Sequence, residues 1–129
     1  MQRVLLVVSG VYGFLAVALG AFGAHGLKSR FAALPDLEQR LAWWQTAAHY
    51  HLIHALAIGL AGLLVARAGA PAIWSGWCFA GGVLLFSGSL YVMTLTGVRS
   101  LGAITPVGGL VMLAGWLALV AAAWRMIGD

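Results

Sequence analysis

The side chains best suited to chemistry are histidines, and three of the four lie between positions 49 and 54. His49, His51 and His54 occur in the run WWQTAAHYHLIH, which begins at Trp43. At 100° per residue, His51 and His54 share one face of a helix, whereas His49 points about 160° away from His51. At most two of the three can therefore face one site. His54 lies furthest along the helix, so we expect it to face the protein interior.

Three kinds of ligand suit these histidines together with His25. A transition metal needs three or four ligands, and His25, His51 and His54 supply three without a carboxylate. A b-type haem needs two histidines from different helices, for which His25 and His54 are available. A neutral molecule such as a quinone needs an apolar slot and hydrogen-bonding groups. The predicted cofactor-binding residues are His25, His54, Tyr91 and Thr105.

The alternative is a structural role, in which a neutral histidine hydrogen-bonds to a carbonyl or hydroxyl group of another helix. Other catalytic signatures are missing from the sequence: no acid lies within a predicted helix core, and no phosphate-binding GxxxxGK[ST] motif occurs. The single cysteine, Cys78, lies in an apolar run and suits packing. The sequence therefore favours a protein that is not an enzyme and requires no cofactor.

The composition is that of a membrane protein. Hydrophobic residues make up 63% of the 129-residue chain and charged residues only 8%, whereas about a quarter of a soluble domain is charged. Four apolar stretches are each long enough to cross a hydrocarbon core of about 30 Å. The basic residues stand singly at segment ends, which suits lipid headgroups rather than nucleic acid. The expected partner is the lipid bilayer.

We predict one all-α domain over 1–129, a polytopic membrane protein with four transmembrane helices in an antiparallel bundle. The first apolar run exceeds the roughly 7 to 15 residues of a signal-peptide core, so we expect it to be retained as a helix. Gly69 and Pro71 mark a tight turn, and Thr105 followed by Pro106 marks an N-cap. Both termini then lie on one side of the membrane. The predicted helices cover about 4–23, 43–66, 73–95 and 106–125.

The segment 28–42 is the only polar stretch of the chain. Pro35, followed by acidic residues, indicates a helix start. We expect a short amphipathic helix at the headgroup level, either separate from the next helix or continuous with it. Trp43 and Trp44 are expected to be interfacial anchors. The basic residues are nearly balanced between the two sides of the membrane. The side with this segment has slightly more of them, so we expect the segment to face the cytoplasm.

Small residues are abundant, with 18 glycines in the chain. Lipid removes the hydrophobic drive for helices to associate, and close approach over small residues replaces it. We therefore expect the first helix to pack against the others, and to end in a left-handed glycine cap within residues 20–26. Ser87 and Ser89 are expected to bond their own preceding carbonyls at a close helix contact. The small residues of the first helix are Ser9, Gly13, Ala16, Gly20 and Ala24.

Four motifs carry a resemblance to a known family: GAFGAHGL at 20–27, a Tyr50-x-x-x-His54 pattern followed by Ala-Leu-Ala, FSGSLY at 86–91, and LGAITPVGG at 101–109. Together with Gly115-Trp116, they resemble the bacterial "domain of unknown function 423" membrane family. The resemblance implies a small inner-membrane protein with several spanning helices and no established activity, related to the eukaryotic transmembrane protein 256 group.

The positions that the resemblance marks include His25 and His54 but not His49 or His51. It therefore favours the His25 and His54 pair over a three-histidine metal site. The remaining marked positions are Ser87, Ser89, Tyr91, Thr105 and Pro106.

We expect a non-enzymatic protein that works by association, as a homo-oligomer or as a small subunit of a membrane complex. The alternative is a binder of haem, metal or quinone that uses His25 and His54 near one membrane surface. A third function, a small channel or transporter, needs a polar path through both leaflets. The half of the bundle that contains Cys78 offers almost none, so such a path would have to be supplied by an oligomer.

Overall fold

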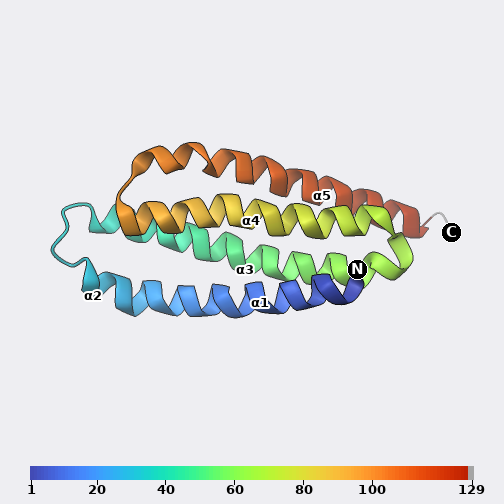
Figure 1. Ribbon diagram of the computed structural model, residues 1–129, viewed down its shortest axis with the longest axis horizontal. Coiled ribbons are helices and arrows are strands. Elements are labelled where there is room, and N and C mark those ends of the chain that lie inside the picture. Colours follow the sequence, from blue (N-terminus) through green and yellow to red (C-terminus); the bar gives the residue numbers. More distant parts are fainter. Residues whose placement is uncertain (128–129) are drawn as a thin grey trace.

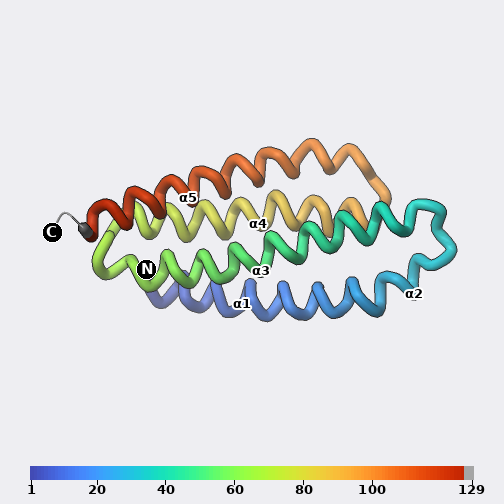
Figure 2. Tube along the Cα trace, turned by 180° about the vertical axis from the view of Figure 1, so that it is seen from behind, coloured from blue at the N-terminus to red at the C-terminus, as the bar shows by residue number. Residues whose placement is uncertain are grey.

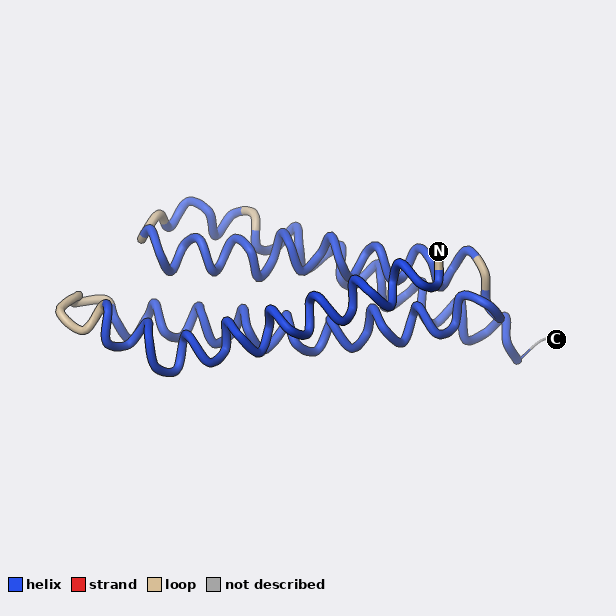
Figure 3. Tube along the Cα trace, turned by 60° about the horizontal axis from the view of Figure 1, so that its bottom comes forward, coloured by secondary structure: helices blue, strands red, loops and turns tan. Residues whose placement is uncertain are grey.

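Four long helices lie alongside one another in the computed structural model, which describes residues 1–127 (Figure 1). All four are long and apolar enough to span a membrane. The prediction of an all-α membrane protein is thus confirmed, and the described residues outside the helices form short connections (Figure 3). The elements are α1 (Gln2–Phe22), a π-helical turn (Gly23–Leu27), α2 (Lys28–Arg30), α3 (Leu37–Ala68), α4 (Ala70–Thr96), a 3-10 turn (Arg99–Ala103) and α5 (Thr105–Ile127).

The helices pack in the order α1, α3, α4, α5, with α3 and α4 in the middle (Figures 1 and 2). Successive long helices are antiparallel, so both termini lie at one end, as predicted (Figure 1). The outer helices α1 and α5 expose large apolar side chains, among them Phe14, Leu117 and Trp124. In a bilayer these side chains face lipid, which is the apolar solvent that the composition predicts.

Bulky side chains on one helix fill the space left by glycines on another. Leu5 of α1 is fully buried, and a Cβ added to Gly62 of α3 or Gly76 of α4 would lie 3.2 or 2.7 Å from its side chain. Phe79 of α4 is likewise fully buried and lies against Gly115 of α5. These contacts are the close approach over small residues that lipid-embedded helices require.

The predicted glycine cap of the first helix is wrong. Gly23 has a right-handed φ of −61°, and helical structure continues through the π-helical turn and α2 to Arg30. Gly23 instead makes room for the indole of Trp44, with which a Cβ at this position would collide. Trp44 is buried and donates Nε1–H to the carbonyl of Leu19 at 2.7 Å. Its predicted role as an interfacial anchor is therefore also wrong.

The polar segment 28–42 contains no separate amphipathic helix. Lys28 to Arg30 extend the first helix, and a single 32-residue helix, α3, begins at Leu37. The continuous alternative is the correct one, and the predicted helix start near Pro35 is confirmed by Asp36 at the N-cap position of α3. At 1.5 Å per residue α3 is about 48 Å long. Its first turns therefore extend beyond the hydrocarbon core.

The other connections follow the sequence signals in part. Gly69 forms the predicted turn with φ of 63°, and α4 begins directly after it. Thr105 does not cap α5, because it is the first helical residue and its hydroxyl lies 2.7 Å from that of Ser89 on α4. Ser89 also donates to its own Phe86 carbonyl, as predicted, whereas Ser87 donates to the Ala47 carbonyl of α3. Ser87 therefore joins two helices.

Candidate functional site

His54 is buried between α3, α4 and α5, with both ring nitrogens engaged. Nε1–H of Trp116 lies 3.2 Å from Nε2 of His54, and Nδ1 of His54 lies 2.8 Å from the Tyr50 carbonyl. An indole can only donate, so Nε2 accepts and Nδ1 carries the hydrogen that it donates to Tyr50. The ring of His54 also packs against Phe79. The expected partner is a carbonyl or hydroxyl group of another helix, whereas His54 bonds a carbonyl of its own helix and an indole of α5.

His51 is also buried but contacts different helices. Its Nδ1 lies 3.2 Å from the hydroxyl of Tyr91 on α4, and its ring is nearly perpendicular to that of Tyr12 on α1, with a centroid distance of 5.4 Å. A cavity of about 130 Å³ with apolar walls lies beside this group. His51 and His54 thus share the inward face of α3, as their spacing predicts, yet belong to separate sets of contacts. The cavity is lined by Tyr12, Leu15, Leu19, His51, Val83, Leu84, Ser87, Gly88 and Tyr91.

The structure does not bring the predicted ligands together. His25 is exposed on the π-helical turn, and α1 packs against α3, whereas His54 faces α5. Tyr91 contacts His51, and Thr105 contacts Ser89. Within residues 1–127, no group of three or more His, Cys, Asp or Glu side chains is placed to hold a metal ion. The proposed metal set of His25, His51 and His54 is therefore not assembled.

A groove of about 520 Å³ lies between α1 and α3, and we call it the α1–α3 groove. Its α1 wall is made mostly of small residues, and its α3 wall carries larger side chains, including the exposed Gln45 and His49. The small residues are evident in the sequence, but the groove is evident only in the structure. The lining residues are Ala16, Val17, Gly20, Ala21, Gly23, Ala24, Trp44, Gln45, Ala48, His49 and Leu52.

The glycines of α1 differ from those in the core. A Cβ at Gly10, Gly13 or Gly20 would meet nothing within 4 Å. In an 18-residue apolar stretch of each candidate span, the one containing α1 has the smallest buried share, 11% against 22 to 50% for the others. The prediction that these small residues pack within the chain thus holds for Ser9, which bonds the Ala55 carbonyl at 2.8 Å, and for the buried Ala16. It is wrong for Gly13 and Gly20.

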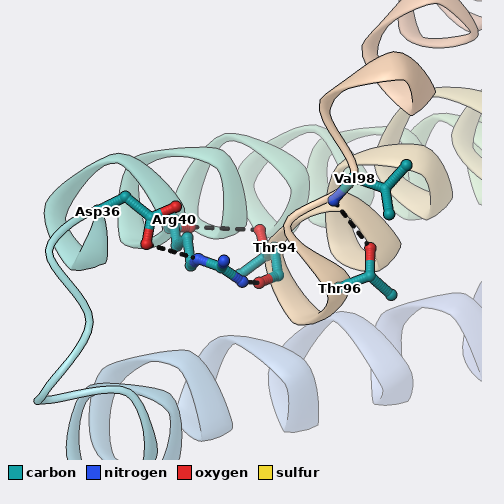
Figure 4. A network of polar contacts seen from close by, with 5 residues as sticks. All are labelled: Asp36, Arg40, Thr94, Thr96 and Val98. Carbon is teal, nitrogen blue, oxygen red and sulfur yellow. Dashed lines mark hydrogen bonds and ion pairs between the residues drawn. The ribbon is translucent and has the colours of Figure 1, made fainter.

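Arg40 forms a polar contact between helices that its position in the sequence does not indicate (Figure 4). Its Nε lies 3.0 Å from Oδ1 of Asp36, and Nη1 donates to the Thr94 carbonyl at 2.8 Å. Thr94 in turn donates its hydroxyl to the carbonyls of Leu90 and Arg40. A cation at the C-terminal end of α4 is favourable because free carbonyls point there. The contact joins the start of α3 to the end of α4.

Residues 19–109 match the family model described as "Protein of unknown function (DUF423)". The chain belongs to this family. The DUF423 chain is 35% identical over 127 residues to a UPF0382 membrane protein of Staphylococcus haemolyticus, covering 98% of this chain and 100% of the relative. The resemblance drawn from the four motifs is thus confirmed.

Two further relatives of this DUF423 protein come from other bacteria. The UPF0382 membrane protein YwdK of Bacillus subtilis is 39% identical, with 98% of this chain and 100% of the relative covered. The UPF0382 inner membrane protein YgdD of Escherichia coli is 41% identical, with 97% and 92% covered. No solved structure matches the chain. The names of these relatives agree with the four membrane-spanning helices and with the predicted multi-pass membrane location.

Proposed function

We propose that this DUF423 protein acts by association within the bilayer, as a non-enzymatic subunit whose α1–α3 groove receives a transmembrane helix. The observation that carries the proposal is the open position of Gly20. This residue lies in the wall of a groove of about 520 Å³, and a Cβ there would meet no atom within 4 Å. Small residues at a helix surface are the usual means by which a second helix approaches closely in lipid.

Two polar side chains in the other wall support a helix as the occupant. Gln45 and His49 are exposed in the groove, and His49 lies about 18 Å along α3 from Leu37 at 1.5 Å per residue. A neighbouring helix can hydrogen-bond to these groups with its side-chain or backbone groups. A protein partner therefore suits both walls of the groove.

The test is the size of the complex in native membranes, measured by crosslinking and by native mass spectrometry in nanodiscs. Gly20→Leu fills the groove and should convert the complex to the single-chain size. Gly81→Leu is the matched control, because a Cβ at Gly81 of α4 also meets nothing within 4 Å but lies outside the groove. It should leave the complex intact. A wild-type protein that is a single chain in both measurements would refute the proposal.

Ligand or redox-cofactor binding is the second function, and the cavity beside His51 and Tyr91 is the observation that favours it. At about 130 Å³, it is smaller than the roughly 300 to 1,000 Å³ of most ligand pockets, which makes association the better supported function. A visible absorption spectrum, metal analysis and lipid extraction of the purified protein test this second function. Negative results in all three would exclude it.

A further inference from the structure

The two walls of the α1–α3 groove are complementary to each other in size. The α1 wall contains Ala16, Gly20 and Ala21, and the α3 wall contains Gln45, His49 and Leu52, among others. Large side chains of one wall would therefore fit against small residues of the other, if two copies of the groove faced each other. A two-fold axis through the groove, parallel to the membrane normal, produces that arrangement, because it places α1 of each copy opposite α3 of the other.

Such an axis preserves depth in the membrane, so the residues that meet must lie at the same level. Contacts within the chain set these levels: Trp44 contacts Leu19 and Gly23, and Ser9 contacts Ala55. This antiparallel register places Gln45 at about the level of Ala21. Gln45 of α3 is thus at the depth of the small residue Ala21 of α1 in the facing copy.

The charged residues near one end of the groove are also complementary between its two walls. Lys28 directly follows the π-helical turn of the first helix, and Glu38 lies seven residues, two helical turns, before Gln45 on α3. Continuing the register past Trp44 and Gly23 brings Glu38 and Lys28 to one level.

Both Lys28 and Glu38 are exposed. Of the other charged residues near this end, Asp36 and Arg40 pair with each other, Arg99 lies over the ring of Trp43, and Arg30 is exposed. The two-fold arrangement therefore sets each Lys28 opposite an acid and not opposite another lysine.

We propose that the occupant of the groove is a second copy of this chain. In the resulting isologous dimer, α1 of each copy packs on α3 of the other, and Lys28 pairs with Glu38 of the partner subunit. The inference rests on the proposed function, because it requires the groove to bind a helix. It goes further in naming the partner, the symmetry and a specific ion pair.

Disulfide crosslinking between two differently tagged copies tests the arrangement in membranes. With Cys78→Ser in both copies, one carries Ala21→Cys and the other carries Gln45→Cys. Oxidation by copper phenanthroline should give a product that contains both tags. Leu117→Cys, on an exposed position of α5, replaces Gln45→Cys in the control and should give no such product.

Charge exchange tests the ion pair in the same assay. Lys28→Glu or Glu38→Lys alone places like charges opposite each other and should lower the crosslinked fraction about two- to fivefold, the range for an exposed pair. The double variant, carrying both changes, should restore it. Equal crosslinking in the single and double variants would refute the ion pair and the register that predicts it.

The two proposals fail in different ways. If Gly20→Leu dissociates a complex with another protein while the tagged copies never crosslink, a second copy is not the occupant but association through the groove stands. If Gly20→Leu changes nothing and no product with both tags forms, both proposals are wrong. A product with both tags that Gly20→Leu abolishes supports both.

Discussion

The indole of Trp116 on α5 donates its hydrogen to Nε2 of His54 on α3 at 3.2 Å. These two helices pack mainly against α4, which lies between them in the packing order. The bond therefore links two helices whose direct contact with each other is small. Because His54 also donates to the Tyr50 carbonyl, the ring is held in one tautomer and one orientation within the bundle.

Replacing His54 by Ala should destabilise the protein by about 1 to 3 kcal/mol, since it leaves the indole N–H of Trp116 without an acceptor and creates a cavity. Trp116→Phe removes the donor and should cost less. Thermal unfolding in nanodiscs measures both effects. Trp124→Phe is the control because Trp124 is 79% exposed. A His54→Ala protein as stable as this control would contradict the assigned role.

Replacing Arg40 by Met should destabilise the contact between the start of α3 and the end of α4. The change leaves the Asp36 carboxylate and the Thr94 carbonyl without their partner. An unpaired group of this kind costs about 1 to 3 kcal/mol. Hydrogen exchange of the Gly97 amide, which bonds the Met93 carbonyl, should become faster, while amides at the Gly69 turn should be unaffected. Equal protection of Gly97 in both proteins would show that Arg40 does not hold α4.

Gly97→Ala should be costly for two separable reasons. Gly97 has φ of 76°, which costs a residue with a Cβ about 1 to 2 kcal/mol. In addition, the Cβ would lie 2.5 Å from Nη2 of Arg40. In an Arg40→Ala background only the backbone cost remains, so Gly97→Ala should be less damaging there. The unfolding free energies of the wild type, the two single variants and the double variant give the coupling energy between the two positions. A coupling energy of zero would mean that the two residues act independently.

Two adjacent glycines on α5 should respond oppositely to the same change. A Cβ on Gly108 would collide with the backbone amide of Phe86 and lie 2.8 Å from the Gly82 carbonyl. Gly108→Ala should therefore force α4 and α5 apart at a cost of about 1 to 3 kcal/mol.

At Gly109 the nearest atom, in the Phe86 ring, is 3.9 Å away. Gly109→Ala should be neutral or stabilising by about 0.5 to 1 kcal/mol, through better helix propensity. Thermal unfolding of both variants under the same conditions compares their stabilities. Similar unfolding temperatures would contradict the close α4 and α5 contact.

The sequence predicts the helices well because their signals are local. Apolar length marks each span, Gly69 marks a turn, and the three-residue spacing of His51 and His54 turns both inward, as observed. The family resemblance likewise depends only on short motifs and on their order along the chain. These features depend on a few neighbouring residues, so no knowledge of the packing is needed.

The errors concern residues whose roles depend on another helix. Trp44 has the position of an interfacial anchor, and only the facing Gly23 makes it a buried donor. Periodicity gives the direction of His54 but cannot identify Trp116 as its partner. In the same way, a row of small residues predicts close contact without showing whether its own chain makes that contact, so Gly20 is expected at a contact with another helix of this chain but lies open.

The connections between the spanning helices are short: 31–36 between α2 and α3, Gly69 alone between α3 and α4, and 97–104 between α4 and α5, most of it a 3-10 turn. Within residues 1–127, few residues lie outside the helices, so most of the surface that this part of the chain offers to a partner belongs to the helices themselves. A partner that binds in the α1–α3 groove would approach it within the plane of the membrane. Its encounters are then confined to two dimensions, and their frequency depends on its abundance per area of bilayer.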